Sequence, residues 1–354
     1  MTCAPALIVT VDTEEEGLWG ATYKANGHTV RNVDGIERFQ EACEQGGVRP
    51  TYLVDTPIVE DDRAVEILRG LQDAGRCEVG AHLHPWCAPP TNGALGPRES
   101  FMCNLPEALQ REKLTRLTDR IEERCGRRPT SFRAGRYGLD MMGVRILSRL
   151  GYLVDSSVIP FSDFSAQGGP NYEPAPFVPY YLDGADIARP HAEGLLLEVP
   201  VSVGFNRVPF ARAARLRSIA SHRALQPLRT VGMLDRMGVL QRIKFSPEQA
   251  DAARMKCLVD AYMRQQAPSM VMMLHSSSLV PGLSPYVPDE GRLARFYDDL
   301  AETFDHCRNG WAMRAETLTS FATVYVDRRK PLTLSSPQRR EGLSDSRVKL
   351  SSFA

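Results

Sequence analysis

The sequence predicts an α/β fold in which parallel strands curl into a distorted (β/α) barrel of seven or eight units. Short apolar runs alternate with amphipathic stretches of helical length along most of the 354 residues, which is typical of repeated βα units. Polar residues follow several of the apolar runs, as at the carboxyl ends of barrel strands. A doubly wound open sheet is the alternative. No G-x-G-x-x-G or Walker A sequence follows any strand, so nucleotide binding has no support.

The first half of the chain supplies five expected strands and four expected helices. Asp34 caps the first helix, Gly46 ends it, and Pro106 and Gly126 bracket the third in the order that favours a helix. The strands are expected at 6–11, 48–54, 77–83, 130–134 and 152–156, and the helices at 35–45, 61–74, 106–125 and 139–150.

The regular alternation breaks after residue 156. Prolines and aromatics over 160–194 indicate an elaborated loop, and the basic segment 205–245 is a second expected insertion. Further strands are expected at 195–201, 269–274 and 312–314, and helices from Ser246 to about 266, at 290–307 and at 316–324. We therefore expect one barrel domain over 1–327 and a disordered polar tail over 328–354, where Ser, Arg, Lys and Pro dominate.

Charge and cysteine content exclude several classes of function. The chain has 43 basic and 43 acidic residues, which gives no global attraction to nucleic acid or to anionic lipid. No apolar run is long enough for a membrane span, and the first residues lack the basic region of a signal peptide. The eight cysteines form no C-x-x-C, which favours reduced thiols and a cytoplasmic protein. The oligomeric state is left open.

Two pairs of candidate site residues follow expected strands. Asp12 and Glu14 are two apart, so an extended chain presents both carboxylates on one face. Taken alone, the acids of 12–16 are more simply a solvated helix start. His82 and His84 share the same spacing, and two imidazoles with a nearby carboxylate favour a catalytic metal site. Zn²⁺ is the preferred ion, with Co²⁺ or Mn²⁺ as alternatives.

Further candidates follow the fourth strand and the late strand at 269–274. Arg133 and Arg136 flank a glycine turn and are either surface side chains or, for one of them, the partner that holds Asp12 ionised. His275 precedes three serines and is either a general acid at the barrel mouth or a structural histidine.

These motifs together resemble the polysaccharide deacetylases of carbohydrate esterase family 4, also called the nodulation-type deacetylase domain. The resemblance spans about 6–325 and includes the segments 10–14, 81–86, 133 and 274–275. The first segment is similar to a D-x-E variant, like those of exopolysaccharide gene clusters. The second departs from the usual H-x-x-x-H, since here the second histidine is His84 and position 86 is Trp.

The resemblance implies roles for the strand-end residues. It makes Asp12 the catalytic base, with direct or indirect metal ligation also open to it, and His275 the general acid. Arg133 is then the partner of the base. Glu14, His82 and His84 are the implied metal ligands.

Four further residues are implied near the substrate. Asp155 falls near another family motif, where it would orient His275 or Arg133. Trp86 and Tyr137 are candidates for stacking on sugar rings, and Arg136 for substrate binding.

The resulting prediction is a metal-dependent hydrolase that removes N-acetyl groups from an amino-sugar glycan or saccharide intermediate. An amidase acting on a small linear or cyclic amide, like allantoinase-like relatives, is the first alternative. The other is a non-catalytic glycan-binding relative. An amidohydrolase-type barrel is disfavoured because its H-x-H pair closes the first strand, whereas here the pair follows the third. The expected partner is a carbohydrate, with no nucleic acid and no membrane span.

Overall fold

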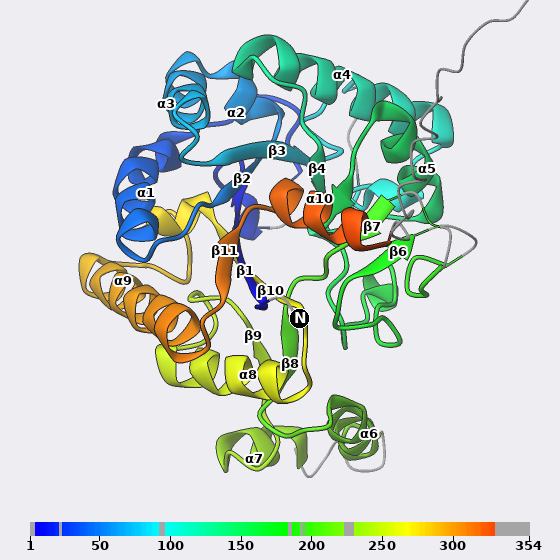
Figure 1. The fold of residues 1–354 in the computed structure, drawn as a ribbon. Helices are drawn as coiled ribbons and strands as arrows, with labels where there is room; N and C mark the ends of the chain where they lie inside the picture. The colour runs from blue at the N-terminus through cyan, green and yellow to red at the C-terminus, as the bar shows by residue number, and fades with distance from the viewer. Residues whose placement is uncertain are drawn as a thin grey trace, which may run out of the picture.

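The fold is a curled sheet of parallel strands surrounded by helices (Figure 1). The computed structural model describes residues 4–20, 23–91, 96–182, 186–191, 194, 196–222 and 230–329. In this part of the chain the strand order is β10-β1-β2-β3-β4-β5-β7-β6, and β11 also pairs with β1. The strands of the sheet are β1 (Ala6–Thr13), β2 (Thr51–Val54), β3 (Glu78–Leu83), β4 (Ser131–Ala134), β5 (Val154–Asp155), β6 (Tyr180–Leu182), β7 (Leu196–Glu198), β10 (Ser269–His275) and β11 (Arg314–Glu316).

All strand pairs of this sheet are parallel except β6 with β7. The segment after β7 approaches β10 from the far edge, where the Ser202 amide donates to the Val271 carbonyl over 3.1 Å. The Met273 amide donates to the Phe245 carbonyl over the same distance. Single hydrogen bonds thus bridge the two edges, and the expected distorted barrel is confirmed in place of the open sheet.

Helices cover the outer face of the sheet. Five of them begin at an aspartate whose side chain accepts a backbone N–H of the first turn, which satisfies a donor that would otherwise lack a partner; the aspartates are Asp55, Asp61, Asp140, Asp251 and Asp289. The helices are α1 (Ile36–Gln45), α2 (Thr56–Glu60), α3 (Asp62–Asp73), α4 (Glu107–Cys125), α5 (Met141–Leu150), α6 (Phe210–Ala220), α7 (Thr230–Arg236), α8 (Ala252–Arg264), α9 (Glu290–Asp305) and α10 (Leu318–Arg329).

The inner face of the barrel holds a small apolar cluster below the functional residues. Alternate residues of a strand face opposite sides, so Ala6 and Ile8 share a side with Asp12. Ala6 and Ile8 pack with Leu318 and Phe321 of α10, which crosses the sheet in Figure 1. Helix α10 therefore packs against the first half of β1, whereas Asp12, at the other end of the strand, lines a cavity.

One expected helix start is wrong. The sequence Ser-Pro-Glu at 246–248 is typical of a helix start, but α8 begins at Ala252 after the Asp251 cap. Glu248 is buried, and its carboxylate contacts His275. The Glu248 side chain therefore contacts the end of β10 and does not lie at the start of a helix.

The two expected insertions contain further short elements. Residues 160–182 form loops, a 3₁₀ turn and β6. The segment 205–245 begins in β8 (Val203–Phe205), continues through α6 and α7, and returns in β9 (Arg242–Lys244), which pairs antiparallel with β8. Helix α10 extends to Arg329, and residues 330–354 of the expected tail lie outside the described residues.

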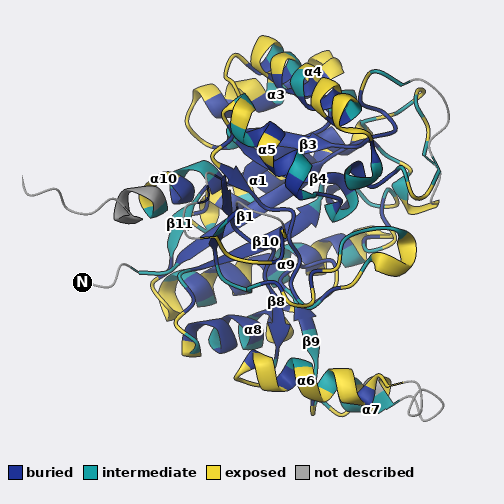
Figure 2. Cartoon of the chain, turned by 90° about the vertical axis from the view of Figure 1, so that its right-hand side faces the viewer, coloured by how far each residue is buried: buried dark blue, intermediate teal, exposed yellow. Residues whose placement is uncertain are grey.

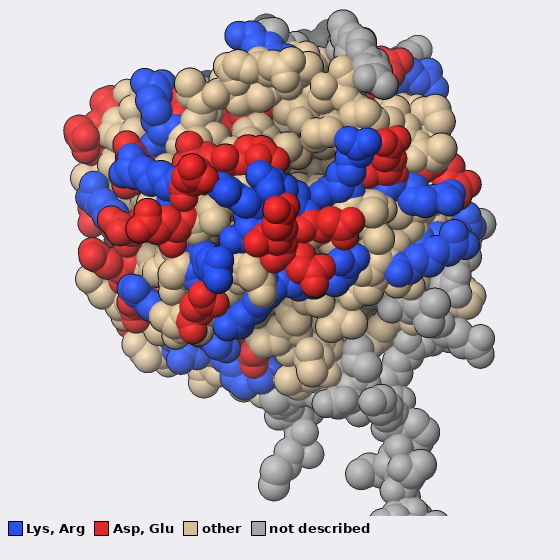
Figure 3. Space-filling view, turned by 90° about the horizontal axis from the view of Figure 1, so that it is seen from above, with Lys and Arg blue, Asp and Glu red and all other residues tan. Residues whose placement is uncertain are grey.

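The outer faces of the helices are largely exposed (Figure 2). Over the end of the molecule that α3 and α4 cover, basic and acidic side chains alternate (Figure 3). No helix within the described ranges has the length and apolar character that crossing a bilayer requires. The described cysteines are free thiols: Cys43, Cys77, Cys87, Cys103, Cys125, Cys257 and Cys307.

Candidate active site

A cavity of about 300 Å³ opens at the carboxyl ends of the parallel strands. Acids, histidines and aromatic rings surround it; the lining residues are Asp12, Glu14, Leu18, Trp19, Tyr23, His82, His84, Trp86, Ala134, Arg136, Tyr137 and His275. This position is where parallel α/β folds place their sites.

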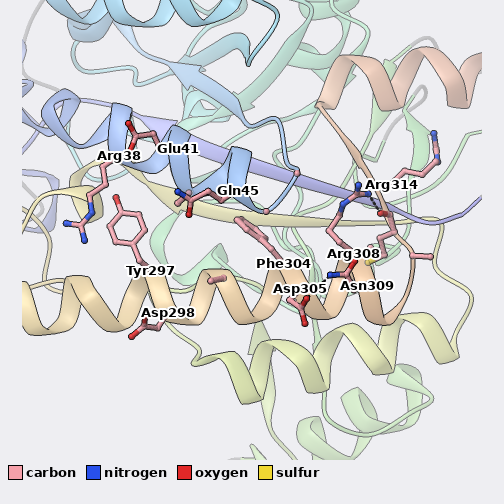
Figure 4. A pocket seen from close by; sticks show the side chains of 16 residues that line it. Arg38, Glu41, Gln45, Tyr297, Asp298, Phe304, Asp305, Arg308, Asn309 and Arg314 are labelled. Atoms are coloured by element: carbon pink, nitrogen blue, oxygen red, sulfur yellow. Dashed lines mark hydrogen bonds between the residues drawn. The ribbon is translucent and has the colours of Figure 1, made fainter.

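A larger cavity of about 890 Å³ lies between α1 and α9 (Figure 4). Arg38 lies over the Tyr297 ring at 4.4 Å, and Arg308 lies near the opposite end. Both groups of potential metal ligands in the described part of the chain include His84 at the strand ends, and neither touches this cavity. The smaller cavity is therefore the candidate active site.

Glu14, His82 and His84 converge on one point of this cavity. The Glu14 Oε2 atom lies 3.2 Å from His82 Nε2 and 3.3 Å from His84 Nε2. All three side chains are almost fully buried. Burial raises the pKa of Glu14, but the nearby imidazoles of His275, His82 and His84 outweigh it, so the net shift is downward and the carboxylate is ionised.

The opposite ring nitrogens of both histidines are anchored. His82 Nδ1 lies 2.9 Å from the Arg133 carbonyl, which can only accept, so Nδ1 carries the proton. His84 Nδ1 lies 2.8 Å from Glu15 Oε2. Each Nε2 therefore points inward beside an ionised carboxylate. Two imidazole nitrogens and one carboxylate oxygen form a donor set that fits a divalent ion such as Zn²⁺.

Glu15 and Asp55 support His84 from behind. The Trp86 indole donates to Glu15 Oε1 over 2.5 Å, and its ring stacks on His84 with centroids 4.3 Å apart. Asp55 accepts the Glu15 amide through Oδ2. Burial, together with the adjacent Glu15 carboxylate, raises the pKa of Asp55 well above its usual range. Burial also acts to raise the pKa of Glu15, but His84 and its other partners lower it on balance.

Asp12 forms a buried ion pair with Arg133. Arg133 Nη1 lies 2.5 Å from Asp12 Oδ1, and the guanidinium is fully buried. Its Nε donates to the Ser156 carbonyl and its Nη2 to the Ser156 hydroxyl, over 2.8 and 2.9 Å. Burial raises the pKa of Asp12, but Arg133, with His82 and His275, lowers it to about 2. Arg133 is therefore the buried partner of Asp12 and not a surface side chain.

His275 ends β10 and is held by Glu248. Its Nδ1 lies 3.0 Å from Glu248 Oε2, and its amide donates to Oε1 of the same carboxylate over 2.9 Å. Ser278 donates to that oxygen as well. Burial lowers the pKa of His275, but Glu248 outweighs it, and Glu14 and Asp12 add to the effect, so the pKa rises to about 9. His275 is thus cationic at neutral pH and lines the cavity.

Aromatic rings surround the entrance. Trp19 meets the His275 ring edge-on at 5.2 Å and is partly exposed. Tyr23 lies 5.0 Å from the Trp86 ring, and the Arg136 guanidinium lies over Tyr23 at 5.5 Å. Tyr137 accepts a hydrogen bond from Lys244 Nζ over 3.0 Å. Trp86, Arg136 and Tyr137 therefore all line the cavity, and their contact with a substrate stays a prediction.

The placement of Asp155 among substrate-binding residues is wrong. Asp155 is fully buried and does not line the cavity. Its Oδ1 accepts the Ser157 hydroxyl over 2.6 Å, and the hydrogen-bonded carboxylate of His275 is Glu248. Two residues past β5, Ser157 in turn accepts the Ala134 amide, so Asp155 stabilises the turn next to Arg133.

The alternative of a solvated helix start for 12–16 is also wrong, because Asp12, Glu14 and Glu15 are buried. Sequence reasoning missed Trp19, Tyr23 and the supporting carboxylates Glu15, Asp55 and Glu248. Asp55 carries a sequence signal, since it follows an apolar strand directly. Glu248 carries none, because the residues around it are typical of a helix start.

No family model and no curated protein matches the sequence. Among solved structures, a candidate glycoside hydrolase/deacetylase from Parabacteroides distasonis has a TM-score of 0.60 at 13% identity, covering 92% of this chain and 72% of that one. A candidate polysaccharide deacetylase from Mycobacterium smegmatis has a TM-score of 0.49 at 18% identity, covering 96% of this chain and 99% of that one. The first likeness shows the fold. The chain therefore folds as a deacetylase-type (β/α) barrel, as its strand-end motifs predict.

Proposed function

We propose that this protein is a metal-dependent hydrolase that removes N-acetyl groups from an amino-sugar glycan or saccharide intermediate. The observation that carries the proposal is the convergence of Glu14, His82 and His84 beside Asp12, with His275 facing the same cavity. The likeness of this fold to the Parabacteroides structure, which is described as a glycoside hydrolase/deacetylase, supports this class of reaction.

Glu14, His82 and His84 would hold the divalent ion, and Zn²⁺ suits this donor set best. When bound, such an ion polarises the acetamide carbonyl and lowers the pKa of water. Glu15 and the Arg133 carbonyl orient the two imidazoles, which reduces the cost of arranging the ligands.

Asp12 takes the proton from the attacking water. Its low pKa keeps the carboxylate ionised, and Arg133 fixes its orientation through Oδ1. His275 gives its proton to the leaving amine. Because Glu248 holds Nδ1, the Nε2 of His275 is the atom that faces the cavity and donates.

The cavity suits a single sugar ring at the point of cleavage. Its volume of about 300 Å³ and its wall of Trp19, Tyr23 and Trp86 favour a flat, partly apolar ring face. A polar rim at Arg136 and Tyr137 would receive the sugar hydroxyls. The free thiols of the described cysteines support action in the cytoplasm.

The test is acetate release from N-acetylglucosamine oligomers by zinc-loaded protein. His82→Ala and Asp12→Asn should each abolish release while circular dichroism shows a folded chain. His306→Ala is the matched control, because His306 also pairs with a carboxylate, Asp260, but lies outside the cavity. An unchanged rate in either active-site variant would remove the role assigned to that residue.

The same assay separates the alternatives. Release of ammonia or of a ring-opened product from small linear or cyclic amides, without acetate release from sugars, would favour the amidase. Binding of glycans without stoichiometric metal would favour a non-catalytic relative.

A further inference from the structure

Helices α6 and α7 form a projection at one end of the molecule, below β8 and β9 in Figures 1 and 2. The projection is defined here by residues 207–222 and 230–239. Phe210 and Ala213 of α6 face inward, whereas most of the remaining α6 and α7 side chains are exposed. The barrel therefore supports this segment from one side only.

The described part of the projection is strongly basic. It contains one acidic residue, Asp235, and five arginines, namely Arg207, Arg212, Arg215, Arg217 and Arg236. No carboxylate of the described residues forms an ion pair with any of these five. On α4, by contrast, Arg111 and Arg116 pair with the acid four residues earlier. The chain as a whole is neutral, whereas this part carries five arginines against one aspartate, a net charge of +4.

Large apolar side chains share the exposed surface with these arginines. Leu216 and Ile219 on α6, and Met233 and Met237 on α7 and just after it, are each more than half exposed. Leu216 lies one turn after Arg212, so the two occupy the same helix face. Exposed apolar groups surrounded by basic ones are typical of segments that lie in a membrane interface.

The projection is connected to the cavity through β9. Lys244 of β9 donates to the Tyr137 hydroxyl, and Arg242 donates to Ser162 in the 160–182 loops. Phe245, directly after β9, accepts the Met273 amide of β10, the strand that ends in His275. A surface that binds the projection therefore also fixes the position of the cavity relative to that surface.

We propose that α6 and α7 dock the protein on an anionic phospholipid surface. Leu216, Ile219, Met233 and Met237 enter the interface, and the arginines meet lipid phosphates. This inference does not depend on the proposed deacetylase activity.

The chemistry of the projection favours lipid over two other occupants. Nucleic acid supplies phosphates but offers little to cover four exposed apolar side chains. A second copy joined through the same patch would place arginines against arginines, which is repulsive. An anionic bilayer satisfies both features at once, because phosphates lie directly above acyl chains.

The experiment is flotation of the full chain with vesicles. One set is phosphatidylcholine alone, and the other contains about one third phosphatidylglycerol. Binding is expected to the anionic set. Arg212→Gln/Arg236→Gln should weaken it about tenfold, and added salt should do the same. Leu216→Ser/Ile219→Ser should weaken it with the charge unchanged. The control Arg111→Gln/Arg116→Gln removes the same charge from α4 and should bind like the wild type.

Other outcomes overturn the proposal. Equal binding to both vesicle sets, or equal weakening by the α4 control, would show that the projection is not the docking surface. Sedimentation velocity that shows a dimer dissociated by Leu216→Ser/Ile219→Ser, with no flotation, would assign the patch to a second copy. Binding to duplex DNA that depends on the arginines alone, without flotation, would assign it to nucleic acid.

Discussion

Asp12 and His275 lie opposite each other at the ends of the parallel strands β1 and β10. The register that pairs Ala6 with Ser269 continues along both strands and brings these two residues together. Asp12 is ionised beside Arg133, and His275 is cationic beside Glu248. One strand pair therefore places an ionised carboxylate and a protonated imidazole at the same cavity. The pKa of each is set by its own partner.

The pH dependence of activity should follow the Glu248–His275 pair. The pKa of His275 is raised from 6.5 to about 9, against the effect of burial, chiefly by Glu248. Because the proposed mechanism needs the protonated form of His275, Glu248→Gln should move the alkaline limb of the kcat/KM profile toward neutral pH. Glu302→Gln, which removes a surface partner of Lys256, is the control. An alkaline limb that stays in place would remove Glu248 from this role.

The same pair should contribute to stability in a defined pH window. The folded pKa lies above the unfolded one, so the contribution is complete below about pH 6.5 and is lost as pH rises through about 9. The loss of unfolding free energy between neutral and alkaline pH should be smaller in Glu248→Gln than in the wild type. Urea unfolding at several pH values measures it, and parallel curves for the two proteins would contradict the assignment.

Glu15→Gln should weaken metal binding without removing a ligand. The Glu15 carboxylate holds His84 Nδ1 at 2.8 Å and also accepts the Trp86 indole. Loss of such an orienting carboxylate typically costs about 10–100-fold in metal affinity. Isothermal titration of metal-free protein with Zn²⁺ measures the change. Glu44→Gln, which removes the exposed partner of Arg76, should bind Zn²⁺ as the wild type does. Equal affinity in Glu15→Gln would rule out this support.

Gly135→Ala should displace His84. A Cβ at position 135 would overlap the His84 ring and lie 2.7 Å from the Leu83 carbonyl oxygen. Backbone cannot move aside cheaply, so we expect a loss of about 1–3 kcal/mol in unfolding free energy and weaker Zn²⁺ binding. Gly70→Ala is the control, since nothing lies within 4 Å of its added Cβ. Normal Zn²⁺ affinity in Gly135→Ala would show that this close approach does not position His84.

The Asp12–Arg133 pair should show strong non-additivity. Asp12→Asn leaves a fully buried guanidinium without its counter-charge, which typically costs about 3–5 kcal/mol. The double variant Asp12→Asn/Arg133→Met removes both charges and should be less destabilised than Asp12→Asn alone. Urea unfolding of Asp12→Asn, Arg133→Met and the double variant, each compared with the wild type, gives the coupling. Additive losses would mean that the two side chains do not act as a pair.

The sequence predicted the parallel strands and the cavity because both depend on local patterns. An apolar run ending in Asp12 and Glu14, or in His82 and His84, is visible without knowledge of the fold. The two-residue spacing of these side chains also predicted which of them face inward, since alternate strand residues share a face.

The supporting residues depend on contacts between distant segments. Glu248 meets His275 across a turn that local patterns predict as helix, and Trp19 reaches the same histidine from the loop after β1. Asp155 was misplaced for the same reason, because its position at the end of a strand gave no indication that Ser157 and the β4 turn would enclose it. Burial and partner choice are tertiary properties that no window of sequence contains.

The most direct test of the metal centre is the stoichiometry of bound Zn²⁺ in protein stripped with chelator and reloaded. Inductively coupled plasma mass spectrometry should find one ion per wild-type chain, and none in the double variant His82→Ala/His84→Ala. The control His306→Ala should retain the full amount. A wild-type chain without stoichiometric metal, or a double variant that still carries one ion, would contradict the account.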